Sequence, residues 1–219
     1  MEILHTAADW ILHLDVHLSA LIARYGVWTY GILFLIVFLE TGVVVTPFLP
    51  GDSLLFATGA LAAQGSLNPW LLFFGLSASA LLGDNLNYWI GRRIGPAVFN
   101  RDGRFLKKAY LDKTRAFYEK HGGKTVILAR FVPIVRTFSP FVAGVGAMTY
   151  PRFLAFSIAG AILWTGIFIP LGYFFGNLPF VKHNFHIAIF GIIGVSVLPM
   201  VIEYWKHRRE AAKRQARPA

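Results

Sequence analysis

The sequence contains no cysteine, and only 15% of its 219 residues are charged. The missing cysteines exclude disulfides, thiolate catalysis and cysteine-based metal sites. A soluble domain is normally about a quarter charged, so the scarcity of charge favours the lipid bilayer as the solvent of this chain. Stretches such as 53–83, 153–181 and 187–202 lack charge altogether, and an apolar helix needs ~20 residues to cross the hydrocarbon core.

Residues 1–27 lack the basic start and the continuous apolar stretch of a cleaved signal peptide. Instead, Trp10, Leu14, Leu18 and Leu21 recur at helical spacing, which predicts an amphipathic helix on the membrane surface. The histidines of this segment are interpreted as part of its polar face rather than as a metal site. Neither a metal nor a cofactor is expected.

Basic residues are concentrated in two parts of the chain. Ten Lys/Arg residues fall within 92–124 and six more follow Glu203, whereas the connection 61–70 has none. Because cytoplasmic loops carry the excess of positive charge, 92–124 and the C-terminus are predicted to be cytoplasmic. The basic tail is interpreted as contacting anionic lipid headgroups and not nucleic acid, because no nucleic-acid-binding module accompanies it.

This orientation predicts a single-domain, all-α polytopic membrane protein. The segments 28–66 and 123–147 must each begin and end on one side of the membrane, which predicts two opposed re-entrant hairpins built from broken helices. Both contain Pro and Gly, and irregular backbone at membrane depth survives where protein or water satisfies it. In chain order we predict a surface helix at 1–27, a hairpin at 28–66, a transmembrane helix at 70–93, a cytoplasmic amphipathic segment at 96–121, a hairpin at 123–147, transmembrane helices at 152–176 and 185–204, and a basic tail at 205–219.

The two halves of the chain also share a weak pattern. The stretch "PFLPGDSLLFATGA" from Pro47 can be laid on "PIVRTFSPFVAGVG" from Pro133, which pairs Ser53 with Ser139. Further on, "NYWIGRRIGP" matches "GYFFGNLP" at an almost unchanged offset. A shared pattern in segments that enter from opposite sides indicates an inverted repeat. Transporters built from such repeats bind their substrates at broken helices near the midplane of the membrane.

The first half contributes acids to the apolar segments and the second half contributes arginines. These residues are Glu40, Asp52, Asp84, Arg130 and Arg136. Each charge would cost about 2.5–3.5 kcal/mol at the centre of the bilayer, so the side chains must face inward and find partners. The predicted pairs join Glu40 or Asp52 to Arg130 or Arg136.

Arg130 and Arg136 are six residues apart, which places them on different faces of a regular helix. A break at Pro133 is predicted to turn both toward one site, and Pro140 is a second place where the backbone is predicted to break. Two interpretations stay open, namely structural ion pairs that hold the hairpins together, or a functional site. Paired arginines suit a phosphate group, and a desolvated carboxylate can carry a proton. Asp84 either joins the carboxylates or only caps or braces a helix.

Patterns of catalysis are missing from the sequence. "GGKT" (122–125) resembles the end of a phosphate-binding loop, but Tyr118 stands where that loop needs glycine. No G-x-S-x-G occurs, and no order of carboxylate, histidine and nucleophile surrounds His121. The sequence therefore predicts a protein that is not an enzyme.

Four stretches carry a resemblance to a known family. "FLETGVVVTPFLPGDSLLFATGALA" (38–62), "GDNLNYWIGRRIG" (83–95), the run 110–148 and "GYFFG" (172–176) closely resemble the bacterial DedA family of inner-membrane proteins, which shares the VTT (SNARE-associated) domain. The resemblance spans nearly the whole chain. It implies two opposed re-entrant hairpins, an inverted repeat, and roles in membrane homeostasis and in maintaining the proton motive force.

The resemblance also implies a substrate class. Some members are implicated in returning undecaprenyl phosphate across the inner membrane, and eukaryotic relatives scramble phospholipids. The family's essential acids fall on Glu40 and Asp52, and its essential arginines on Arg130 and Arg136. We therefore expect a flippase of phosphate-bearing lipids, linked to the proton motive force, in the bacterial inner membrane. The alternatives are a passive phospholipid scramblase, a non-transporting scaffold and a small-ion antiporter.

The expected partners are anionic or phosphate-bearing lipids and protons, and the sequence is compatible with a homo-oligomer. The residues assigned to the site are Arg130, Arg136, Pro133 and Ser53 for substrate, and Glu40, Asp52 and Asp84 for protons.

Overall fold

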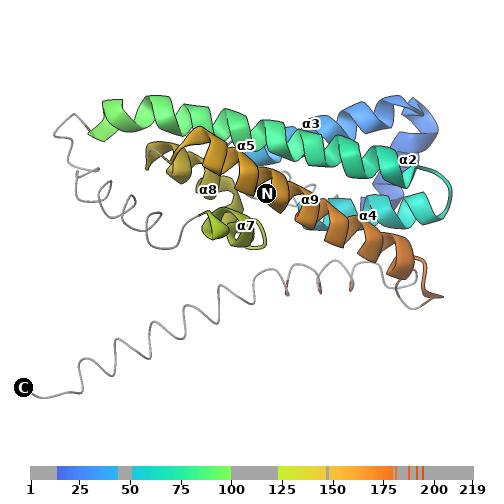
Figure 1. Cartoon of the computed structure of the whole chain (residues 1–219). Helices are drawn as coiled ribbons and strands as arrows, with labels where there is room; N and C mark the ends of the chain where they lie inside the picture. Colours follow the sequence, from blue (N-terminus) through green and yellow to red (C-terminus); the bar gives the residue numbers. More distant parts are fainter. Residues whose placement is uncertain are drawn as a thin grey trace, which may run out of the picture.

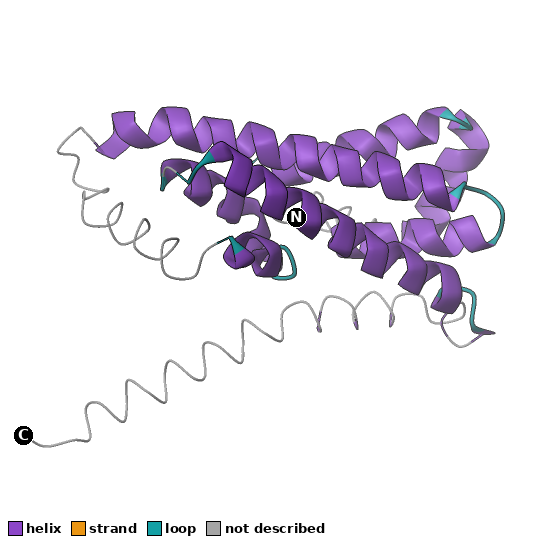
Figure 2. Ribbon diagram, viewed as in Figure 1, coloured by secondary structure: helices purple, strands orange, loops and turns teal. Residues whose placement is uncertain are grey.

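A computed structural model describes residues 14–43, 51–99, 123–146 and 148–179, together with residues 181, 187, 191 and 194. Every element within these ranges is an α-helix, and the helices pack into one elongated bundle (Figures 1 and 2). The prediction of an all-α protein is therefore confirmed for the described residues. The helices are α2 (Leu14–Tyr25), α3 (Trp28–Gly42), α4 (Gly51–Ala63), α5 (Pro69–Phe99), α7 (Lys124–Ala129), α8 (Pro133–Val145) and α9 (Tyr150–Phe175).

Two long helices set the length of the bundle. Helix α5 covers the predicted segment 70–93 and continues to Phe99, and α9 covers most of the predicted segment 152–176. Among the described residues, α9 is the helix that is both long and apolar enough to cross a membrane. The predicted segment 96–121 from residue 100 onward, almost all of 185–204, and the tail 205–219 lie outside the described residues.

The N-terminal amphipathic helix is present over residues 14–25 as α2. Its apolar stripe does not lie free, because Leu14 and Leu18 are buried in the same core cluster as Leu55 of α4. Leu21 and Ile22 pack against this cluster from its edge. The sequence pattern predicts a helix on the membrane surface, but over residues 14–25 its apolar side chains pack against the core of the protein.

Helices α3 and α4 form a hairpin that begins and ends at one end of the bundle. The Asn68 backbone N–H, just beyond α4, donates to the Tyr30 hydroxyl in the first turn of α3 (2.7 Å). The end of α9 lies there too, because the Gln64 side-chain amide donates to the Asn177 Oδ1 (2.8 Å). This end of the bundle therefore carries the uncharged connection between α4 and α5.

Helices α7 and α8 form a second hairpin that begins and ends at the opposite end. Before α7, Gly123 packs directly against the ring of Phe156, early in α9. After α8, the Met148 carbonyl accepts a hydrogen bond from the Tyr88 hydroxyl, late in α5 (2.5 Å). Arg92 donates to that same hydroxyl (2.9 Å), so this hairpin opens beside the start of the basic segment.

Each hairpin packs its second helix against the long helix of the other half of the chain. A Cβ at Gly59 of α4 would overlap the Ile169 backbone of α9, and a Cβ at Gly144 of α8 would overlap the Tyr88 backbone of α5. Gly59 and Gly144 are 85 residues apart, the offset that also relates Tyr88 to Tyr173 in the long helices. The alignment of Ser53 with Ser139, at an offset of 86, is one residue out of register with this packing.

The close crossing of α4 and α9 predicts a sharp contrast between two glycine substitutions. A Cβ at Gly172 would overlap the Phe56 carbonyl group, whereas a Cβ at Gly75 would meet nothing within 4 Å. Overpacking of this kind typically costs about 1–3 kcal/mol. We expect Gly172→Ala to lower the thermal unfolding midpoint of the detergent-solubilised protein, and Gly75→Ala to leave it unchanged or raise it. Equal midpoints for the two variants would contradict the crossing.

Candidate functional site: buried charges between the hairpins

The helix is interrupted between the two arginines, so Arg130 and Arg136 do not lie on one continuous helix. Helix α7 ends in a tight turn, in which the N–H groups of Arg130, Phe131 and Val132 bond to carbonyls three residues earlier. Val132 is extended (φ −116°, ψ 108°) and Pro133 begins α8, as expected because a proline disfavours the helical conformation of the preceding residue. The predicted break at Pro133 is confirmed.

Pro140 behaves differently from Pro133. The sequence offers it as a second place for the backbone to break, but α8 runs through it to Val145 without interruption. Proline removes one helical N–H, the one that would bond to the carbonyl four residues earlier, which here belongs to Arg136. The helix therefore continues at the cost of one hydrogen bond, and the prediction of a break at Pro140 is wrong.

Arg136 lies between the two predicted carboxylates. Its Nη2 donates to the Glu40 Oε1, and its Nη1 donates to the Asp52 Oδ1 at 2.6 Å. All three side chains are buried, with at most 7% of any of them exposed. This group of residues, which also includes Trp164 (see below), is called the Arg136 cluster. It joins α3, α4 and α8, so the predicted pairing across the two halves is confirmed for Arg136.

Glu40 is held at the start of the next helix. The Gly51 backbone N–H, at the first residue of α4, donates to the Glu40 Oε1 (3.2 Å). A carboxylate is favourable at a helix N-terminus because free N–H groups and the helix dipole point toward it. A side chain at Gly51 would overlap the Glu40 carboxylate, so glycine is required here for close approach.

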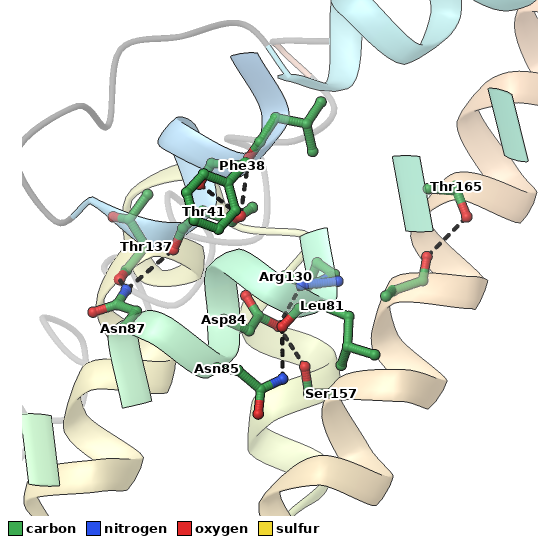
Figure 3. Close-up of polar contacts among 12 residues, drawn as sticks. Phe38, Thr41, Leu81, Asp84, Asn85, Asn87, Arg130, Thr137, Ser157 and Thr165 are labelled. Atoms are coloured by element: carbon green, nitrogen blue, oxygen red, sulfur yellow. Dashed lines mark hydrogen bonds and ion pairs between the residues drawn. The ribbon is translucent and has the colours of Figure 1, made fainter. Parts of the chain in front are cut away.

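Arg130 takes a partner other than the predicted one. Its Nη2 lies 2.5 Å from the Asp84 Oδ2, and the Ser157 hydroxyl donates to the same oxygen (2.6 Å). Figure 3 shows these three side chains meeting between α5 and α9. They are called the Arg130 cluster. Asp84 is thus a buried partner of an arginine, and the prediction that Arg130 pairs with Glu40 or Asp52 is wrong.

Trp164 connects the two clusters. Its indole N–H donates to the Asp52 Oδ1 (2.8 Å), and the guanidinium carbons of Arg136 and Arg130 lie 5.0 and 5.6 Å from a Trp164 ring centroid. Neither Trp164 nor Ser157 is among the predicted site residues. They are seven residues apart on α9, which places them on one helix face, but this spacing is informative only when the face that meets the arginines is known.

Asn87 ties one helix of each hairpin, α3 and α8, to α5. Its side-chain amide donates to the Thr41 carbonyl at the end of α3 (3.2 Å) and to the Thr137 carbonyl of α8 (2.6 Å). Both bonds are visible in Figure 3. The helices that carry Glu40 and Arg136 are therefore held to the same buried amide, close to the ion pair.

The site has more acid than base and several unused polar atoms. Three carboxylates face two guanidiniums, so the five groups carry a net charge of −1 when all are ionised. Within the described part of the chain, five atoms of the region are buried without a hydrogen-bond partner: the Glu40 Oε2, Ser53 Oγ, Asn87 Oδ1, Arg130 Nη1 and Arg136 Nε. Ser53 is buried on α4, next to Asp52 in sequence.

The charged groups are closed off from the surface. Glu40, Asp52, Asp84, Arg130 and Arg136 are each no more than 5% exposed. A hollow of about 460 Å³ lies elsewhere, between the start of α5 and the end of α9, and its lining is apolar and includes none of these groups. Across the described ranges, no three His, Asp or Glu side chains gather as a metal site would require.

Comparison with known proteins identifies the family. The VTT domain model matches residues 49–174, a range that includes Asp52, Asp84 and both arginines of the site. No solved structure matches the chain. The fold and the match together define a helical membrane protein of the VTT-domain class.

Relatives place the chain more narrowly. Protein DedA of Escherichia coli K12 is 55% identical over 216 residues, covering 97% of this chain and 99% of that protein. The membrane protein Rv0364 of Mycobacterium tuberculosis is 46% identical over 199 residues (86% and 85% covered). Inner membrane protein YqjA of E. coli is 35% identical over 157 residues (71% of each). The chain belongs to the DedA family, as a close orthologue of DedA, and the predicted family is confirmed.

The two clusters predict a pattern of energetic coupling. Arg136→Gln leaves Glu40 and Asp52 buried without their positive partner, a change that typically costs about 3–5 kcal/mol. In double-mutant cycles on unfolding free energy, we expect couplings of about 0.5–3 kcal/mol for Glu40 with Arg136 and for Asp84 with Arg130. The crossed pairs, Glu40 with Arg130 and Asp84 with Arg136, should couple more weakly. Equal coupling in all four cycles would refute the pairing.

Proposed function

We propose that this protein moves a phosphate-bearing lipid across the bacterial inner membrane, with protons as the coupling ion. The observation that carries the proposal is the bridging of Arg136 by two carboxylates from the other half of the chain. A phosphate group offers a guanidinium the same bidentate hydrogen bonds as a carboxylate. A lipid phosphate can therefore replace Glu40 and Asp52 on Arg136 when those carboxylates are neutralised.

The charge balance of the site supports protons as the coupling ion. An uncompensated charge is costly in a buried site, and the five ionised groups leave one negative charge over. Taking up a proton neutralises the surplus, and protonating a second carboxylate releases an arginine for the phosphate. Proton uptake and phosphate binding then favour each other, as coupled transport requires. Arg130 Nη1 and Arg136 Nε, which are buried and unpartnered among the described residues, supply donors for a phosphate.

The hairpins supply a route from both sides. We infer that α3–α4 enters the membrane from the periplasm and α7–α8 from the cytoplasm, as re-entrant hairpins. Exposed Trp70 and Trp89 support a position of the bundle across the membrane. They lie nineteen residues apart on α5, which is about 28 Å along the helix. That span is close to the ~30 Å hydrocarbon core, at whose boundaries tryptophan is enriched. The name of the relative YqjA, an inner membrane protein, supports the same location.

Transport measurements test the proposal directly. The full chain is reconstituted in liposomes that contain either a fluorescent phosphate-monoester lipid or a matched phosphatidylcholine, and transfer between leaflets is followed by quenching with dithionite. We expect proton-gradient-dependent transfer of the phosphate lipid, at least about tenfold slower in Arg136→Ala because an interaction to the charged phosphate is lost. Arg152→Ala, which removes an exposed arginine from the first turn of α9, serves as the matched control.

Two results would contradict the proposal in different ways. Equal rates of transfer by the wild type and Arg136→Ala would show that Arg136 does not bind the phosphate during transport. Transfer of both lipids at similar rates, with no response to a pH gradient or to Glu40→Gln, would instead show a passive scramblase.

The hairpin topology predicts opposite accessibility for two connections. The chain has no cysteine, so single cysteines can be introduced at exposed Ser66, between α4 and α5, and at exposed Thr149, between α8 and α9. In right-side-out membrane vesicles we expect an impermeant maleimide to label Ser66→Cys and not to label Thr149→Cys. In inverted vesicles the pattern should reverse. Labelling of both cysteines from one side would rule out hairpins that enter from opposite sides.

A further inference from the structure

The ring of Trp164 contacts three of the five charged groups. It donates its N–H to Asp52, and its ring lies near the guanidiniums of both Arg136 and Arg130. Trp164 is completely buried. Because its ring contacts both guanidiniums, Trp164 links the Arg136 cluster to the Arg130 cluster.

The shape of α9 lets both arginines reach this ring. Ser157, Gly160 and Trp164 lie on one buried face of the helix. The Arg130 side chain crosses α9 at Gly160, where an added Cβ would lie 3.7 Å from the Arg130 Cδ. Arg130 therefore spans from Trp164 to the Asp84–Ser157 hydrogen bonds, while Arg136 approaches the ring from α8.

A ring and a carboxylate use different parts of a guanidinium. Carboxylates and phosphates accept hydrogen bonds from the N–H groups at its edge, whereas an aromatic ring attracts the cation through its π electrons. A phosphate that displaces Glu40 or Asp52 therefore does not compete with Trp164. The ring contact can persist while the partners at the edge are exchanged.

Two neighbouring guanidiniums repel each other once their carboxylates are neutralised. At that moment neither Asp84 on Arg130, nor Glu40 and Asp52 on Arg136, holds its arginine in place, and the contacts of both guanidiniums with the Trp164 ring remain. We propose that Trp164 is a positioning residue that holds Arg130 and Arg136 together as a two-arginine site, so that an incoming lipid phosphate meets donors already in place. This inference rests on the proposed function and adds the residue that sets the affinity of its site.

A matched control variant distinguishes a positioning role of Trp164 from a merely structural one. Phe153 is also fully buried on α9, but it stacks on Tyr88, with ring centroids 4.3 Å apart, and no arginine of the described residues stacks on it. Trp164→Leu and Phe153→Leu each remove one buried aromatic ring from the same helix. Trp164→Phe keeps a ring against the arginines and loses only the N–H that binds Asp52.

The test measures binding of a fluorescent phosphate-monoester lipid to the full chain in detergent micelles, with a matched phosphatidylcholine as reference. We expect Trp164→Leu to weaken binding of the phosphate lipid by roughly tenfold or more, Trp164→Phe by less than about threefold, and Phe153→Leu not at all. Binding of phosphatidylcholine should be the same in all four proteins. Equal losses of phosphate-lipid affinity in Trp164→Leu and Phe153→Leu would overturn the positioning role.

A second measurement decides the matter even if the wild type shows no preference for phosphate, a result that would refute the proposed function. Thermal unfolding of single and double variants gives the coupling of Trp164→Leu with Arg130→Gln and with Arg136→Gln, and the same couplings for Phe153→Leu. Positioning requires that both arginines couple to Trp164 and neither to Phe153. If neither arginine couples to Trp164, the inference is wrong whatever the protein transports.

Discussion

The interaction on which the rest of the structure depends is the ion pair of Arg136 with Glu40 and Asp52. Three buried charges survive together only if each has a partner and further hydrogen bonds. Glu40 obtains one from the first N–H of α4, and Asp52 obtains one from the indole of α9. The packing of α4 on α9, and the placement of the first turn of α4 beside the end of α3, satisfy these requirements. The apolar helices surround the resulting polar centre.

Much of this arrangement is readable from the sequence because charge is scarce in it. With acids in one half and arginines in the other, the pairing of Arg136 across the halves follows from electrostatics alone. The choice of Asp84 by Arg130 does not, because it depends on how α5 and α9 rotate about their axes. Trp164 and Ser157 lie in the uncharged part of α9, after Arg152, where nothing in the pattern separates a ring that faces a site from one that faces lipid.

The prolines show the same limit. Pro133 follows a residue that can become extended and a turn that ends α7, so the break is favoured locally. Pro140 has a similar local signal, yet α8 continues through it, and Gly144, one turn later, packs closely against α5. Charge, which is expensive to bury, therefore predicts more of this fold than helix breakers do. The candidate site is also closed, so the proposed transport requires the hairpins to separate from the long helices at some step.

The exchange of packing partners between the halves bears on how the protein is made. Gly59 of α4 packs on Ile169 of α9, more than a hundred residues later in the chain. At a synthesis rate of ~5–20 residues per second, the first hairpin waits on the order of ten seconds for its partner. Glu40 and Asp52 must spend that time without Arg136. A nascent chain cannot complete its first half alone, and its early acids must remain near water, or protonated, until the second half arrives to enclose them.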